Sequence, residues 1–382
     1  MRKSVFWLHL ITGVVAGVVI LIMSVTGVLL MYQKQITAWA DGGVVRVDES
    51  AGAPMEIGAL LAKVQEVEKL PPSTITVDSD RTKAVGLSWG REKMLFINPY
   101  TGAVVSEGSK GMRSFFQLMI DWHRWLGMSG EKRPIGKAIT GACNLGFLFL
   151  VVSGFYLWWP RTMKAMRAVV TFDFSLRGKA RDWNWHNVAG FWSAVPLFFV
   201  VITATFFSYT WTTDLLYRVT GNEPPPKPAA VPSAGAKRPE GATERGGRQS
   251  EAPGASYSGL GAHFALAQAQ VKDWRTVTLR MPTTPGGPLN FTVDGGNGAR
   301  PDLRSAITIN PKTGAIEKTE TYNSYNAARK IRLWIRWLHT GEAGGFIGQT
   351  IAGIASAAGA LLVWTGVSLA LRRFFKRKEA VA

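Results

Sequence analysis

Histidine is the residue type whose placement in this chain points to chemistry. Four of its five histidines lie at the ends of long apolar segments, and these are His9, His123, His186 and His339. Neutral imidazoles are the commonest metal ligands among side chains. Haem iron accepts two axial imidazoles while its macrocycle lies between helices. The four positions predict two sites for b-type haem, each with two histidine ligands, at two depths of a membrane.

Other interpretations of these histidines are weaker. A zinc site needs three or four protein ligands, and Asp121 is the only carboxylate within two residues of any of these four histidines. A lone histidine at a membrane edge usually packs against its neighbours or caps a helix. Four histidines in two pairs, each pair at one membrane level, are more typical of metal ligands. The single cysteine, Cys143, is expected to be a packing residue. The absence of Cys-x-x-Cys-His argues against covalently attached haem. His263 has no partner and is expected to be ordinary.

Four apolar segments must position these histidines. Each contains about 20 largely uncharged residues, the length that a membrane core requires. We interpret the first segment as a transmembrane helix and not as a cleaved signal peptide, because no small-residue cleavage site precedes Tyr32. The sequence therefore predicts a multi-pass membrane protein with transmembrane helices over 1–32, 131–160, 184–209 and 341–371.

Basic residues beside the helices predict the orientation. Lys and Arg resist translocation near a transmembrane end, and they are concentrated in the loop 161–183 and the tail 372–382. Both termini are expected to be cytoplasmic, which makes 33–130 and 210–340 periplasmic. The net charge of +18 is spread over the chain, and the two outside segments are only mildly basic. No nucleic-acid partner is expected.

Each outside segment alternates helical and strand-like patterns. The expected fold is a membrane four-helix core with two small α+β lobes, each made of one helix on an antiparallel sheet. The proline- and glycine-rich stretch 221–256 is expected to be a disordered linker. The expected helices are 57–67 and 262–271, and the expected strands are 74–77, 84–89, 94–97, 277–281, 289–293 and 306–309.

The chain is internally duplicated. Asn98-Pro-Tyr-Thr-Gly-Ala103 recurs as Asn310-Pro-Lys-Thr-Gly-Ala315, and Ser153-Gly154 answers to Thr365-Gly366 at the same offset. His9, Gly13 and Thr26 match His186, Gly190 and Thr203 at a shorter offset. Each half is then helix, lobe, helix, and a pseudo-twofold axis would bring His9 toward His186. His123 and His339 are four residues out of register, which is about one turn and keeps them on the same helical face.

Several motifs resemble the PepSY-associated transmembrane family of iron-regulated inner-membrane proteins. They are Leu8-His9-x3-Gly13, Trp122-His123-Arg124, Trp185-His186-x3-Gly190 and Leu338-His339-Thr340-Gly341. The likeness covers nearly the whole chain except the linker, although Trp122 stands where the family usually has Leu. It implies a protein of the bacterial inner (plasma) membrane whose periplasmic lobes are PepSY-like. It also implies a haem-dependent oxidoreductase that reduces a ferric siderophore of the ferrioxamine type, so that iron is released during uptake.

Further partners follow from the residues near the histidines. Arg124, Arg332 and Arg336 are candidates to neutralise haem propionates, with contact to lipid headgroups as the alternative for each of them. The chain lacks a Gly-x-Gly-x-x-Gly segment after a strand, so a quinol or a partner protein is expected to donate electrons. The alternative functions are a haem-free transporter or permease subunit and a PepSY-type regulatory membrane protein.

Overall fold

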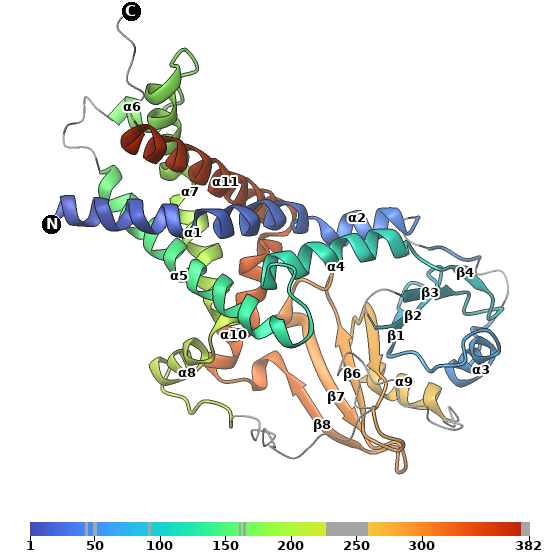
Figure 1. The fold of residues 1–382 in the computed structure, drawn as a ribbon. Helices are drawn as coiled ribbons and strands as arrows, with labels where there is room; N and C mark the ends of the chain where they lie inside the picture. Colours follow the sequence, from blue (N-terminus) through green and yellow to red (C-terminus); the bar gives the residue numbers. More distant parts are fainter. Residues whose placement is uncertain are drawn as a thin grey trace, which may run out of the picture. The chain divides into compact units, whose positions relative to one another are not determined.

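The computed structural model describes residues 1–42, 45–48, 52–90, 93–159, 162, 166–226 and 259–375 (Figure 1). The chain divides into two compact units. The membrane unit comprises Met1–Gln33, Leu118–Asn222 and Ile331–Ala382, and the sheet unit comprises Lys34–Gln117 and Glu223–Lys330. The expected linker lies outside the described residues from 227 onward, as do parts of the basic loop 161–183 and of the tail 372–382.

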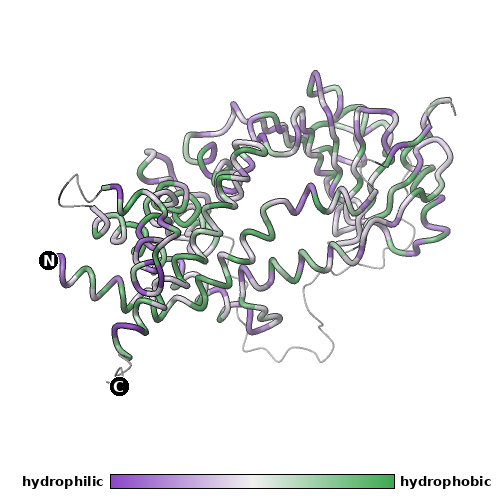
Figure 2. Tube along the Cα trace, turned by 90° about the horizontal axis from the view of Figure 1, so that it is seen from above, coloured by the Kyte–Doolittle hydropathy of each residue, from purple (hydrophilic) through white to green (hydrophobic). Residues whose placement is uncertain are grey.

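Four long helices form the membrane unit. Each is long and apolar enough to cross a membrane, and Figure 2 shows them hydrophobic over much of their length. Apolar side chains such as Val15, Val152, Val195 and Ile354 are exposed on them, as lipid-facing residues would be. The four helices are α1 (Arg2–Leu30), α5 (Arg133–Trp158), α7 (Gly178–Ser208) and α11 (Gly345–Phe374).

The long helices pack in a closed arrangement. Helix α1 packs against both α5 and α11, and α7 packs against the same two helices. A small buried cluster lies among them, formed by Ala16, Ile20, Phe147, Leu197, Val201 and Ala355. The equivalent helices of the two halves therefore use equivalent neighbours, as the duplication predicts.

Shorter helices precede or follow the long ones in the chain. Helices α4 and α10 lead through tight turns into α5 and α11. At the second turn Gly341 has φ +69°, and a Cβ there would lie 2.4 Å from the Gly348 carbonyl oxygen. Only glycine fits this approach. The short helices are α2 (Gln33–Ala40), α4 (Lys110–Trp125), η2 (Gly130–Lys132), α6 (Met166–Val170), α8 (Thr210–Val219), α10 (Ala327–His339) and η6 (Glu342–Gly344).

The sheet unit contains one antiparallel sheet in the order β4-β3-β2-β1-β5-β6-β7-β8. Helices α3 (Ile57–Val67) and α9 (Leu260–Ala269) pack against it, and the 3-10 turns η4 (Pro301–Leu303) and η5 (Tyr322–Ser324) flank its later strands. The strands are β1 (Thr74–Asp78), β2 (Val85–Trp89), β3 (Lys93–Ile97), β4 (Val104–Ser106), β5 (Thr276–Arg280), β6 (Leu289–Asp294), β7 (Arg304–Ile309) and β8 (Ile316–Thr321).

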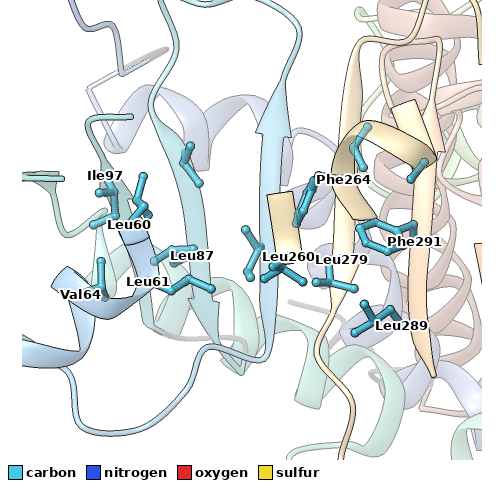
Figure 3. Packing of buried hydrophobic residues seen from close by; sticks show 14 of the residues in the cluster. Leu60, Leu61, Val64, Leu87, Ile97, Leu260, Phe264, Leu279, Leu289 and Phe291 are labelled. Carbon is cyan, nitrogen blue, oxygen red and sulfur yellow. The ribbon is translucent and has the colours of Figure 1, made fainter. Parts of the chain in front are cut away.

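This sheet differs from the expectation of two separate lobes. Strand β1 of the first half pairs with β5 of the second over five residue pairs, from Thr74 with Arg280 to Asp78 with Thr276. The buried residues of both halves, including Leu61, Leu87 and Phe291, belong to one cluster (Figure 3). Two small sheets with one helix each bury little apolar surface, and joining them edge to edge satisfies the backbone groups of β1 and β5.

Candidate cofactor-binding site

The first histidine pair lies between α1 and α7. The ring centroids of His9 and His186 are 6.5 Å apart, and the ring planes cross at 84°. Both histidines are near the start of their helices and are partly buried. The proximity that the duplication predicts for these two residues is present in the structure. We call them the 9/186 pair.

The second pair comes from the short helices that precede α5 and α11. The ring centroids of His123 on α4 and His339 on α10 are 6.3 Å apart, and the planes cross at 58°. His123 lies two residues before the end of α4, whereas His339 is the last residue of α10. The four-residue mismatch between the halves is therefore absorbed at the helix ends, and the rings still meet. We call them the 123/339 pair.

Each of the four imidazoles has a hydroxyl oxygen beside its Nδ1 atom. The hydroxyls come from the long helices, one from each. The Nδ1 to oxygen distances are 2.9 Å for His9 and Ser153, 2.9 Å for His186 and Thr365, 3.0 Å for His123 and Thr26, and 3.3 Å for His339 and Thr203. His339 Nδ1 also lies 2.9 Å from the backbone carbonyl oxygen of Val200.

These contacts decide which ring nitrogen carries the proton. The hydroxyl of Thr26 donates its one hydrogen to the Ile22 carbonyl at 2.6 Å, and that of Thr365 donates to the Leu361 carbonyl at 2.7 Å. Each hydroxyl is then left to accept, so the histidine Nδ1 must donate. A carbonyl such as that of Val200 can only accept. The Nδ1–H form leaves Nε2 with a free lone pair, which is the form that a metal binds.

Small residues let the imidazoles approach the helices. A Cβ added to Gly154 would lie 3.2 Å from His9 Cε1, one at Gly366 would lie 3.3 Å from His186 Cε1, and one at Gly27 would lie 3.4 Å from His123 Cε1. Each glycine directly follows the hydroxyl residue that binds the same ring. The fourth position is Ala204, after Thr203. This exception occurs where the hydroxyl contact is longest.

Burial keeps the 123/339 pair neutral. Burial, followed by the neighbouring His339, lowers the pKa of His123 to about 4. The pKa of His339 is also lowered by burial, against the opposing effect of the Val200 carbonyl. Both imidazoles are therefore uncharged at neutral pH, and neutral imidazole is the metal-binding form.

The two pairs lie near opposite ends of the long helices. On α1, His9 and the Thr26 that contacts His123 are 17 positions apart, and on α7 the same spacing separates His186 and Thr203. A rise of 1.5 Å per residue makes this about 26 Å. That length is close to the roughly 30 Å of a bilayer's hydrocarbon core. The two pairs are thus separated by nearly the thickness of such a core.

The donor set fits haem. Two imidazoles bound in line to one metal ion at about 2.0 Å place their ring centroids about 6 Å apart, which matches both pairs. No group of three or more His, Cys, Asp or Glu side chains that could hold a metal lies together among the described residues. Two facing imidazoles suit a metal whose other four ligands belong to a macrocycle. The residues that would hold haem are therefore the four histidines.

Two of the three candidate arginines, Arg124 and Arg336, lie beside tryptophans. The guanidinium carbon of Arg124 is 4.6 Å from the ring centroid of Trp125, and that of Arg336 is 4.9 Å from that of Trp337. Both arginines are exposed. Their role toward propionates stays a prediction. His263 lies on α9 in the sheet unit, apart from both pairs.

A family model described as PepSY-associated TM region matches residues 6–373. The chain belongs to this family. The match spans both halves, so all four histidines of this PepSY-associated chain lie inside the family region. No curated protein matches the chain.

Sequence reasoning identified the histidines of this PepSY-associated protein and missed the groups that orient them. The sequence analysis used four hydroxyl residues only as evidence of the duplication and predicted no contact for them: Thr26, Thr203, Ser153 and Thr365. A signal was available, because a hydroxyl residue followed by glycine occurs at three of these four positions. Such a dipeptide inside a membrane helix presents an acceptor and leaves room beside it for a ring.

Proposed function

We propose that the chain is a membrane oxidoreductase that moves electrons across the bilayer and reduces the iron of a ferric siderophore, with two b-type haems as cofactors. The observation that carries this proposal is the pair of facing imidazoles at each end of the four-helix arrangement, with centroids 6.5 Å and 6.3 Å apart. A bound haem supplies one-electron transfer, tuned by its axial ligands and surroundings.

The chain's own residues bind and orient. The four histidines would hold the haems, and the hydroxyls of Ser153, Thr365 and Thr26 would fix the tautomer and ring direction of their imidazoles. Outer hydrogen bonds of this kind raise ligand basicity and strengthen metal binding. The apolar side chains of the long helices exclude water from the space between the pairs.

The siderophore part of the proposal is supported by the motifs around the histidines and by family membership. A chelate that holds ferric iron tightly releases it after reduction, so a one-electron donor at a membrane suits such a substrate. A quinol or a partner protein would supply the electrons.

We also propose a bacterial inner membrane, with both termini in the cytoplasm. The end of the membrane unit that holds the 9/186 pair carries basic residues from three helices, among them Arg2, Lys179 and Arg372. Arg2 donates to the Leu157 carbonyl at 2.6 Å, which joins the start of α1 to the end of α5. Basic residues at one end favour that end as the cytoplasmic side.

The test is an absorption spectrum of the full-length protein in detergent, oxidised and then reduced with dithionite, with haem counted per chain. Two low-spin haems per chain are expected. Addition of ferrioxamine to the reduced protein should reoxidise it with formation of ferrous iron. A fully folded protein that binds no haem after loading would overturn the proposal and favour a transporter or a regulatory protein.

A further inference from the structure

Arg332 is a half-buried cation close to the 123/339 pair. It lies on α10, and its guanidinium carbon is 6.0 Å from the ring centroid of Phe207. The Phe207 ring in turn meets the ring of His339 edge-on, with centroids 5.3 Å apart. No acidic side chain pairs with Arg332 among the described residues. Burial lowers the pKa of Arg332 below its ordinary value.

A half-buried guanidinium without an acidic partner is stabilised by a bound anion. Removing a guanidinium from water costs free energy that a paired anion offsets. Exposed arginines need no such partner, because water screens them. Arg124 and Arg336 are of the exposed kind. Among the arginines around this pair, Arg332 therefore gains most from a bound anion.

The position of Arg332 along α10 indicates which anion. Seven residues separate it from His339, which is close to two helical turns, so both lie on one face. The separation along the axis is about 10 Å. A ligand held by His339 and wide enough to cover this distance could place a carboxylate at Arg332. Tyr217 on α8 is buried near the same guanidinium, and its phenol O–H can act as a second donor to that anion.

We propose that Arg332 binds a carboxylate of the tetrapyrrole held by the 123/339 pair, as its half-buried counter-ion. This inference rests on the proposed function. It assigns the anchoring role to Arg332 in preference to Arg124 and Arg336. The planar fork of arginine matches a carboxylate with two parallel hydrogen bonds.

The experiment compares haem with haem dimethyl ester, in which both carboxylates are blocked. Full-length protein made in haem-depleted cells is loaded with either compound, and transfer to excess apomyoglobin is followed by absorbance. The phase that disappears in His339→Ala identifies the 123/339 site. Arg332→Gln is expected to speed haem release in that phase on the order of tenfold. Arg332→Lys should release haem at a rate between those of wild type and Arg332→Gln. With the dimethyl ester, Arg332→Gln and wild type should release at the same rate.

The control is Lys330→Gln, which removes a positive charge from the same helix and should leave release unchanged. Equal release by wild type and Arg332→Gln with haem would overturn the inference, as would equal acceleration with the dimethyl ester. An effect that appears only when phosphatidylglycerol is present would assign Arg332 to a lipid phosphate instead. Wild-type protein that takes up no haem would overturn the proposed function itself, which is a different result.

Discussion

The two histidine pairs are built from different helices although the chain is duplicated. In the 9/186 pair the rings are carried by the long helices α1 and α7, and α5 and α11 supply the hydroxyls. In the 123/339 pair the rings are carried by the short helices α4 and α10, and α1 and α7 supply the hydroxyls. Helices α1 and α7 thus provide ligands at one end and orienting groups at the other.

This exchange of roles couples the two ends. The 17-residue spacing on α1 and on α7 fixes both the distance and the relative rotation of the two pairs. One inserted residue between His9 and Thr26 would rotate one end against the other by about 100°. The position of the 9/186 pair depends only on the four long helices. The position of the 123/339 pair also depends on how the short helices α4 and α10 are held.

The pairs also differ in how uniform their orienting bonds are. Both rings of the 9/186 pair lie 2.9 Å from a hydroxyl. In the 123/339 pair His123 keeps such a bond, but His339 is 3.3 Å from Thr203 and 2.9 Å from the Val200 carbonyl. A backbone carbonyl cannot be removed by substitution, so this one ligand should tolerate loss of its hydroxyl.

Removing the histidine ligands should have the largest effect on haem content and should separate the two pairs most clearly. His9→Ala and His186→Ala should each lose the same haem, and His123→Ala and His339→Ala should each lose the other, because one missing axial nitrogen leaves the site incomplete. Haem per chain, measured as the pyridine complex, should fall by half in every variant. Loss of one shared haem in all four variants would contradict two separate sites.

Removing the hydroxyls should have the next largest effect. Thr365→Val and Thr26→Val should weaken haem binding at their sites by about 10-fold to 100-fold, the usual cost of losing an outer-shell partner of a metal ligand. Thr203→Val is the matched control and should cost much less, because the Val200 carbonyl still accepts from His339. Haem affinity from titration of the haem-free protein measures each change. Equal costs at all three positions would refute the carbonyl assignment.

Acidification should weaken the haem-free 123/339 site. The pKa of His123 is about 4 in the folded chain against an ordinary value of 6.5, so the unfolded chain binds the proton more readily. The stability that neutral His123 contributes is present above pH 6.5 and is lost as the pH falls toward 4. The melting temperature of haem-free protein should drop over this range. His123→Gln should flatten that part of the profile, and an unchanged slope would count against burial of the ring.

Adding a methyl group beside a ring should give the smallest effect. In Gly154→Ala the new Cβ would lie 3.2 Å from His9 Cε1, so the ring must shift by a few tenths of an ångström. We expect slightly weaker haem binding and a changed low-spin electron paramagnetic resonance signal. The reverse change, Ala204→Gly, should alter only the signal of the 123/339 site. A signal unchanged in both variants would show that these contacts do not set ring orientation.

Much of the sheet unit was predictable from the sequence. The helix 57–67 and the strands near 74–77, 94–97 and 289–293 have clear apolar periodicity and lie where the structure has α3, β1, β3 and β6. Strands β4 and β8 were missed, because both are largely exposed and show no alternation of buried and exposed residues. The joining of β1 to β5 was also missed, since pairing between distant strands leaves no local pattern.

In the membrane unit, the sequence indicated the four long helices and both histidine pairs. Duplication was the decisive signal, because it related His9 to His186 without any knowledge of packing. Helical structure was expected at His123 and His339, but the extents of α4 and α10 were not predicted, although α10 combines Arg329, Arg332 and Arg336 with apolar residues at helical spacing. The Val200 contact could not be predicted, because a backbone carbonyl has no sequence signature.

The pairing of β1 with β5 is centred on Thr76 and Thr278, whose hydroxyl oxygens are 3.1 Å apart. Around this point the register is symmetric: Ile75 faces Leu279 and Val77 faces Val277. Ile75 and Val277 occupy equivalent places in the two halves, as do Val77 and Leu279. Each residue therefore pairs with the equivalent of the other's partner, as in an isologous contact between identical subunits. A protein made of one half alone would present this edge to its own copy. The present chain has the form of such a homodimer fused into a single polypeptide.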